Sequence, residues 1–551
     1  DFPEEEEIGF IKPKRNAKVE QAVTYWENTL QVLQQHGTIW LDKKCVSNEV
    51  RYYEGVRYCK DGCQSVSFCG DVKIPIEHLR WCVWWDSHAN VYHNPLESAP
   101  GVAGSDFILY VAALHSDKCE RQKTVAFAAH CQMEQALDSI QTSIHKHTEL
   151  LYTIKHEILH ALGFTASLYA FYRDQFGHPL TERDQYTGKP LVFDAGLLMY
   201  KWSDRVVSQV TRPSWRLKGQ TIRKTVNMII TPNVVREVRA HFGCPNLEGG
   251  ELEDQGINGT AITHWEKRVF ENEFMTGTYT QNPYENAGNL EWGQGMGCDF
   301  VMKSCYHWME TKINNNEDIH PFCIHANRGQ LKTDCTRNRK AVAICNLTVE
   351  GVPASDVNRY GGSVSLADYC PYLQEFVWKQ EDSLVRGSRC ALTQNRVDPT
   401  QNYLLETYGP QSACFHHGSE WSLLQCDSQF KPHYGSGCYE YRCDVTQGLQ
   451  VIVMGQAYTC YYAGQQVLIG YVDPRWLHQG NITCPPCQEL CQSQGITCPP
   501  ERRDIYDVHP NANTNERIPC AASFIYSWNL TTLSALCISF KLVLDILYCY
   551  R

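Results

Sequence analysis

Basic residues are the minority charge in this chain of 551 residues, with 50 lysines and arginines against 61 aspartates and glutamates. The formal net charge of −11 opposes attraction to the phosphates of nucleic acids. No run of Lys or Arg is long enough to reverse that sign locally. We therefore expect no nucleic acid among the partners of this protein.

Long apolar runs are equally scarce. The one extended run lies between Trp528 and Tyr550 and contains Lys541 and Asp545, each of which costs about 2.5 to 3.5 kcal/mol near a bilayer centre. This excludes a protein with several membrane spans and leaves membrane attachment through the C-terminal tail as an alternative. The chain begins DFPEEEEIGF, which lacks the basic and apolar character of a signal peptide, so we expect that a leader has been removed.

Cysteine, in contrast, is abundant. The chain has 27 cysteines, and those from Cys45 to Cys498 form an even set that can pair completely. So many cysteines favour an oxidising compartment, because reducing cytosol would leave them as free thiols. Four Asn-X-Thr tripeptides offer glycosylation sites at Asn258, Asn346, Asn481 and Asn529. We expect a secretory-pathway protein, extracellular or at the cell surface, with a cytoplasmic protein holding reduced cysteines as the alternative.

The length of the chain predicts several domains, because one hydrophobic core stops growing well below 551 residues. We expect an α+β, multidomain fold with a disulfide-rich, strand- and loop-rich C-terminal domain. No fixed-period repeat is evident, and the oligomeric state is left open. The predicted parts are 1–168, 169–310, 311–500 and a tail at 501–551.

Periodicity predicts four elements. Apolar residues recur at helical spacing from about 14 to 36 and again from 148 to 162, where the recurrence stops at Gly163. Residues 232–242 form a third predicted helix. The apolar run from Asp106 to Ala113 is bounded by polar residues and glycine, and it predicts a buried strand.

The chemistry is concentrated in the second helix, in His156-Glu-Ile-Leu-His160. Two histidines four residues apart lie on one helical face, where both imidazoles can reach one metal ion. Glu157 lies beside the first ligand, so its carboxylate can act as a general base on water at the metal. Zinc in such a site polarises a peptide carbonyl and lowers the pKa of water to about 7. The motif therefore predicts hydrolysis of peptide bonds.

The motif continues through Ala161-Leu-Gly163, giving the HExxHxxG pattern of metzincin peptidases. The glycine lets the helix end in a left-handed turn that leads toward a third ligand. Ordinary metzincins supply a histidine three residues later, where this chain has Ala166. The third ligand must therefore come from elsewhere in the chain.

In these motifs the sequence resembles the leishmanolysin family, especially its animal branch. The resemblance covers residues from about 40 to 500 and rests also on Glu291-Trp-Gly-Gln-Gly-Met-Gly-Cys298 and Ala367-Asp-Tyr-Cys-Pro371. It implies that His264 is the third zinc ligand, that Met275 is the methionine beneath the metal, and that one zinc ion is bound per chain. The implied activity is a zinc-dependent endopeptidase acting on proteins or peptides in cell-surface or matrix proteolysis, adhesion and migration.

The stretches from Asp138 to Lys155 and from Met275 to Cys298 are shorter than the family pattern. They leave open a second hypothesis, a catalytically weak adhesion or matrix-binding protein that retains a structural zinc site. A second cysteine group also has two interpretations. Cys484-Pro-Pro-Cys487, with Cys491 and Cys498, has zinc-knuckle spacing, but disulfides are favoured in a secreted chain.

Overall fold

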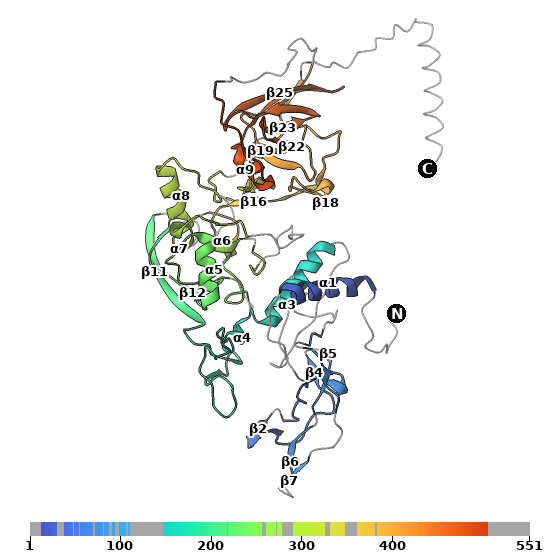
Figure 1. Cartoon of the computed structure of the whole chain (residues 1–551), viewed down its shortest axis with the longest axis vertical. Coiled ribbons are helices and arrows are strands. Elements are labelled where there is room, and N and C mark those ends of the chain that lie inside the picture. The colour runs from blue at the N-terminus through green and yellow to red at the C-terminus, as the bar shows by residue number, and fades with distance from the viewer. Residues whose placement is uncertain are drawn as a thin grey trace, which may run out of the picture. The chain divides into compact units, whose positions relative to one another are not determined.

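The computed structural model describes residues 13–29, 38–110, 147–255, 260–277, 290–325, 331–347 and 361–504, with short interruptions inside these ranges. The chain divides into two compact units. The first comprises residues 1–327 and 344–377, and the second comprises residues 328–343 and 378–551. Both helices and strands are present (Figure 1), so the expected α+β class is confirmed. The predicted four-part division stays a prediction.

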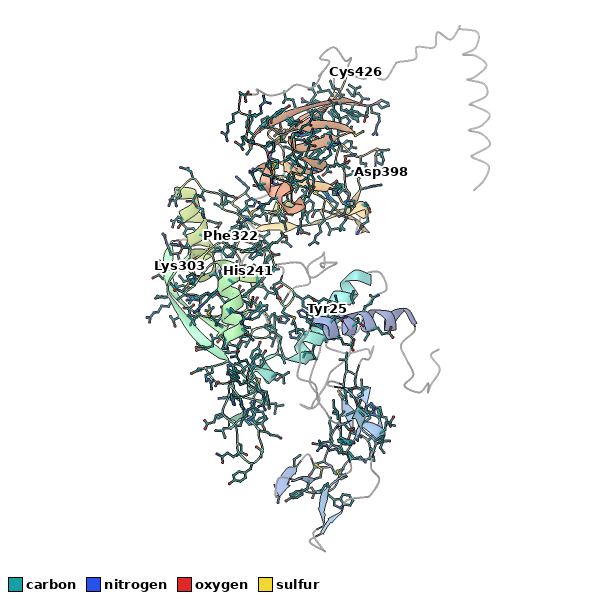
Figure 2. All side chains as sticks on the ribbon, in the orientation of Figure 1. Tyr25, His241, Lys303, Phe322, Asp398 and Cys426 are labelled. Atoms are coloured by element: carbon teal, nitrogen blue, oxygen red, sulfur yellow. A yellow bond between two sulfur atoms is a disulfide. The ribbon has the colours of Figure 1, made fainter. Side chains whose placement is uncertain are left out.

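The first unit begins with helix α1 (Pro13–Thr29), which packs across α3 (His147–Leu162) (Figure 1). Their interface buries Ala22 and Trp26 of α1 against Ile154 and Ile158 of α3. Lys155 Nζ lies 3.6 Å from the centroid of the Tyr25 ring, which Figure 2 labels. Both predicted helices are thus confirmed, except that residues 30–37 of the first lie outside the described residues.

A cysteine-dense segment follows, stabilised by the disulfides Cys45–Cys59 and Cys63–Cys82. The strands here are short and form one four-stranded and two two-stranded sheets. Its elements are β1 (Thr38–Ile39), β2 (Val50–Tyr53), β3 (Val56–Cys59), β4 (Phe68–Cys69), β5 (Val72–Lys73), η1 (Ile76–His78), β6 (Trp84–Asp86), β7 (Val91–His93) and β8 (Val102–Ala103). Of the strand predicted at 106–113, residues 108–110 are described and are not in a strand, because Tyr110 packs on a small core without backbone pairing.

After α3, the short helix α4 (Ala166–Tyr169) leads into three consecutive hairpins that the sequence did not predict. An aspartate recurs every ten residues, at Asp174, Asp184 and Asp194, and its Oδ1 accepts backbone N–H groups of the turn. The third hairpin pairs β9 (Phe193–Asp194) with β10 (Met199–Tyr200). The expectation of no fixed-period repeat was therefore wrong for this segment.

The core of the first unit forms around a long hairpin, β11 (Val207–Leu217) and β12 (Gln220–Ile229), with β13 (Gly250–Glu251) on its edge. Helix α5 (Pro232–Phe242) matches its prediction, since Pro232 starts it and Gly243, at φ +65°, ends it. Aromatic side chains fill the core, including Phe242 and Phe322, the latter labelled in Figure 2. Its remaining elements are α6 (Lys267–Phe270), α7 (Cys298–Met302), α8 (Cys305–Asn314), η2 (Ser365–Ala367) and β16 (Leu373–Glu375).

The second unit is built mainly of strands. Its largest sheet has the order β21-β20-β26-β19-β22-β23-β24, and β25 also pairs with β26. The strands of this sheet are β19 (Ser412–His416), β20 (Ser422–Gln425), β21 (Ser428–Phe430), β22 (Ser436–Asp444), β23 (Gly448–Val453), β24 (Gln456–Thr459), β25 (Gln466–Val472) and β26 (Leu477–Thr483). Its core buries Trp421 and Tyr439 completely.

Disulfides staple this second unit, as the sequence predicted. They pair Cys335–Cys414, Cys390–Cys438, Cys443–Cys491, Cys460–Cys484 and Cys487–Cys498. The knuckle-like cysteines around helix α9 (Cys487–Cys491) are therefore in disulfides rather than in a metal site. None of the described helices is long and apolar enough to cross a membrane, and the predicted tail segment lies outside the described residues.

Candidate metal centre

Helix α3 presents two of the predicted ligands. Ile154 and Ile158 face the α1 interface, and residues two further along a helix point to its far side. His156 and His160 therefore share the face away from α1. The register of the helix is fixed by this apolar packing and by the Trp26 indole N–H, which donates to the Lys155 carbonyl at 3.1 Å.

His264 approaches from a separate segment of the same unit. That segment is held on one side by the Glu253 N–H, which donates to the His264 carbonyl at 2.9 Å, and on the other by the Trp265 N–H, which donates to the Met275 carbonyl. Ile262 just before it has φ +67°, a conformation that costs a β-branched residue free energy. The Tyr169 hydroxyl donates to the Ile262 carbonyl at 2.8 Å and stabilises that bend.

The three histidines meet at one point. The Nε2 atoms are 3.1 Å apart between His156 and His160, and 3.2 Å apart between His264 and each of the other two. Zinc–nitrogen bonds of about 2.0 to 2.1 Å at tetrahedral angles place ligand nitrogens about 3.3 Å apart. The observed spacing therefore fits one tetrahedral metal ion bound by three imidazoles.

The other ring nitrogens decide which tautomer is present. Each Nδ1 lies within hydrogen-bond distance of a backbone carbonyl: that of Phe274 for His156 (2.8 Å), Phe164 for His160 (2.6 Å) and Thr260 for His264 (2.9 Å). A carbonyl only accepts, so each Nδ1 carries the proton and each Nε2 presents a lone pair. Three lone pairs converging at this distance repel one another unless a cation lies between them. Sequence reasoning missed these carbonyls, because a backbone acceptor has no residue-type signature.

His156 and His264 are also held in the neutral form that a metal ligand needs. Burial, followed by the neighbouring His160 and His264 rings, lowers the pKa of His156 well below its usual value. Burial likewise lowers the pKa of His264. Neutral imidazoles do not have to lose a proton before they bind a metal ion.

Glu157 and Gly163 complete the motif on α3. Glu157 follows His156 directly on the helix and is 6% exposed, so its carboxylate is screened from bulk water. Gly163 follows the last residue of the helix with φ +154°, a positive value that favours glycine. The Phe164 N–H donates to the Leu159 carbonyl at 3.1 Å, so the helix ends in a turn at this glycine.

Met275 lies in the turn that supports His156. It is 1% exposed, and the preceding Phe274 provides both the carbonyl that accepts from His156 Nδ1 and a ring 5.8 Å from the His156 ring. The Met275 N–H donates to the Glu273 carboxylate at 2.5 Å. Glu273 is a residue that sequence reasoning missed.

Glu273→Gln is expected to flatten part of the pH dependence of stability. Burial raises the pKa of Glu273 from 4.5 to about 7, so its contribution to stability is present below pH 4.5 and is lost as pH rises through 7. Glutamine keeps an acceptor for the Met275 N–H and cannot ionise. Between pH 5 and 8, the free energy of unfolding of the zinc-free variant should therefore fall by about 2 to 3 kcal/mol less than that of the zinc-free parent protein. Urea unfolding at several pH values checks this. If the free energy of unfolding changed with pH in the same way in both proteins, the prediction would be wrong. Glu237→Gln on α5 is the control.

The predicted glycosylation sites are only partly described. Asn258 and Asn529 lie outside the described residues. Asn346 is 7% exposed and its Oδ1 accepts from the Tyr372 N–H, while Asn481 accepts from Ser419. Glycosylation at these asparagines stays a prediction.

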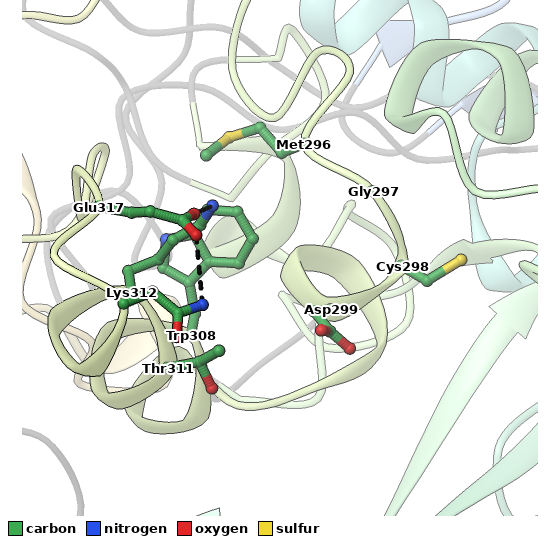
Figure 3. A pocket seen from close by; sticks show the side chains of 9 residues that line it. Met296, Gly297, Cys298, Asp299, Trp308, Thr311, Lys312 and Glu317 are labelled. Carbon is green, nitrogen blue, oxygen red and sulfur yellow. Dashed lines mark hydrogen bonds and ion pairs between the residues drawn. The ribbon is translucent and has the colours of Figure 1, made fainter.

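A second recess lies beside α7 and α8, with a volume of about 430 Å³. Trp308 and Met296 line it, and Lys312 and Glu317 form an ion pair there (Figure 3). None of its lining residues belongs to the histidine cluster. Its one cationic side chain, Lys312, is paired with Glu317, and the recess does not contain the cluster of histidines that defines the metal centre.

Three neutral histidines around one point, with a glutamate between two of them on a helix, define a metallopeptidase site. A family model described as Leishmanolysin matches residues 87–497. The chain belongs to the leishmanolysin family of metallopeptidases.

Its similarity to individual proteins agrees with this. It is 39% identical to the leishmanolysin-like peptidase of Drosophila melanogaster, over 98% of this chain and 86% of that protein. It is 37% identical to the leishmanolysin-like peptidase of Caenorhabditis elegans, over 94% and 84%. Leishmanolysin of Leishmania tropica is 24% identical over 77% of this chain and 57% of its own length. The chain therefore falls in the leishmanolysin-like, animal branch of the family.

Proposed function

We propose that this protein is a zinc-dependent endopeptidase of the metzincin type, which binds one zinc ion through His156, His160 and His264 and hydrolyses peptide bonds of proteins. The observation that supports this most strongly is the convergence of three Nε2 lone pairs at 3.1 to 3.2 Å. Three neutral nitrogen ligands with tetrahedral spacing suit zinc, and three protein ligands leave a fourth position for substrate or water.

The chemistry divides between the metal and Glu157. Zinc, when bound, polarises the scissile carbonyl and makes water a stronger nucleophile at neutral pH. Glu157 would accept the proton of the attacking water and deliver it to the nitrogen of the leaving amine. Three backbone carbonyls would keep the imidazole rings in a fixed orientation during the reaction, those of Phe274, Phe164 and Thr260. No covalent intermediate with the protein is needed.

Hydrolysis of a quenched fluorescent peptide library by purified protein of measured zinc content tests this proposal. We expect cleavage that disappears when zinc is chelated and returns when one equivalent of zinc is restored. Cleavage that persists in zinc-free protein would refute the proposal. The library also reports the preferred residues around the cut.

We also place the protein in the secretory pathway, at the cell surface or outside the cell. The support is the disulfide bonding of both units, which a reducing compartment would not maintain. Labelling with a thiol reagent under denaturing conditions should find few free cysteines between Cys45 and Cys498. Many free thiols there would support the cytoplasmic alternative instead.

The hairpins after α4 favour a second candidate function, adhesion or matrix binding with a structural zinc site. Their tips carry large apolar side chains in water, with Phe176 74%, Tyr186 90% and Leu198 79% exposed. Such exposed apolar side chains, one on each of three successive hairpins, would suit contact with another protein. A protein that holds one zinc ion but cleaves no peptide of the library would favour this function over the peptidase.

A further inference from the structure

Next to His264 along the chain and in contact with its backbone lies a group of acidic residues, most of them buried, that the peptidase chemistry does not use. Its members come from β13 and the residues directly after it, from the residues that follow His264, and from the turn after η2. They are Glu251, Glu253, Asp254, Glu266 and Asp368. Among the described residues, Lys224 and Arg268 are the basic residues that form ion pairs with this group. Five carboxylates therefore share two cationic side chains in this part of the structure.

The two cations form ion pairs with only three of the five carboxylates. Arg268 Nη2 lies 3.1 Å from Glu251 Oε2, and its Nε lies 3.3 Å from Asp368 Oδ2. Lys224 Nζ lies 2.6 Å from Asp368 Oδ2 and 3.2 Å from Asp254 Oδ2. Within the described residues, no basic side chain forms an ion pair with Glu253 or Glu266. These two carboxylates are each 0% exposed, which makes an uncompensated charge expensive.

The lack of a positively charged partner is clearest at Glu266. Its Oε1 accepts the Arg268 N–H at 3.0 Å and caps helix α6, whereas its buried Oε2 has no hydrogen-bond donor among the described residues. Buried polar atoms in folded proteins nearly always have a partner.

The geometry points to a cation as the missing partner. One oxygen from each of Glu253, Asp254 and Glu266 lies within 4.8 Å of the others. Three carboxylates suit calcium, which takes six to eight oxygen ligands, whereas magnesium is usually bound through one or two carboxylates and keeps several waters. We propose that Glu253, Asp254 and Glu266 form a second metal site, specific for a hard divalent cation of the size of calcium. Asp254 is the least buried of the three, with 24% of its side chain exposed, and it gives the ion access from solvent.

This ion would stabilise the position of His264, the third zinc ligand. The Glu253 N–H donates to the His264 carbonyl at 2.9 Å, and the Glu266 N–H donates to the Glu251 carbonyl at 3.0 Å. A cation that joins Glu253 to Glu266 therefore ties together the two chain segments that fix the position of His264. Calcium should stabilise the fold and slow the loss of zinc, although it takes no part in hydrolysis.

Thermal unfolding of the full, zinc-loaded chain tests the proposal with CaCl2, against MgCl2 and NaCl at matched ionic strength. We expect calcium at about 5 mM to raise Tm by about 3 to 8 °C and magnesium to raise it much less. Zinc release to a zinc-selective dye should slow about threefold or more in calcium. Zinc content is measured separately, so a defect of the zinc site is distinguished from a defect of this one.

Glu266→Gln is the decisive variant, because glutamine keeps the cap on α6 and removes the charge. It should abolish the calcium-dependent shift, while Glu237→Gln on the exposed face of α5 keeps it. Asp254→Asn, at an exposed position, serves if Glu266→Gln fails to fold, and it should weaken the calcium response about tenfold. The proposal is overturned if calcium leaves the Tm of the parent protein unchanged, or if these two variants respond to calcium like the parent.

Discussion

Glu157→Gln is expected to lower kcat for peptide hydrolysis by about 10²- to 10⁴-fold while zinc content stays at one ion per chain. Glutamine matches the volume of the buried glutamate, so the helix and its histidines should keep their positions. It cannot take a proton from water, so only the general base is lost. The measurement is steady-state cleavage of a peptide chosen from the library, with zinc determined on the same samples.

Glu237→Gln, on the exposed side of α5, is the matched control for removing one carboxylate and should leave kcat unchanged. If Glu157→Gln retained the parent kcat, another group would have to be the base, and the assignment of Glu157 would be wrong. If the variant lost its zinc as well, the effect would be structural rather than catalytic.

His264→Ala is expected to weaken zinc binding by at least about 100-fold and to remove peptidase activity with it. Removing a residue that only hydrogen-bonds a metal ligand lowers metal affinity by about 10- to 100-fold. Removing a ligand itself should therefore lower zinc affinity by about 100-fold or more. The remaining two histidines on α3 cannot close a tetrahedral site alone. Competition with a zinc-selective dye measures the affinity, and the peptide assay measures activity.

His178→Ala is the control, because His178 is 76% exposed in the first hairpin after α4 and lies outside the metal centre. It should bind zinc as the parent does. Zinc retained at parent affinity by His264→Ala would show that the third ligand comes from elsewhere in the chain, and it would remove the main support for the proposed site.

Local sequence signals were enough to predict two helices of the first unit, α3, which carries two of the histidines, and α5. Helix α5 has Pro232 at its start and a glycine at φ +65° after its end, and its observed bounds are those predicted. Helix α3 differs from its prediction by one residue at the start. In both, apolar periodicity and terminal residues act within one or two turns, so neighbouring sequence is sufficient.

Other features depended on contacts that periodicity does not encode. The hairpins around Asp174, Asp184 and Asp194 escaped prediction because their turns differ in length and share little beyond the aspartate and a glycine. Residues 108–110 were expected in a strand because they are apolar, but apolar residues need burial rather than pairing, and Tyr110 finds it against a small core.

The sequence by itself determined the spacing of His156, Glu157 and His160, because a helix fixes which side chains share a face within a single turn. It also determined the disulfide-rich character of the chain, through the number of its cysteines. His264 was known only through family resemblance, since no local rule relates residues 104 positions apart. The tertiary structure decided that its Nε2 meets the other two, that three backbone carbonyls set the tautomers, and that Glu253, Asp254 and Glu266 gather behind it. Those are distances between segments remote in sequence, and they follow from how the strands and helices pack.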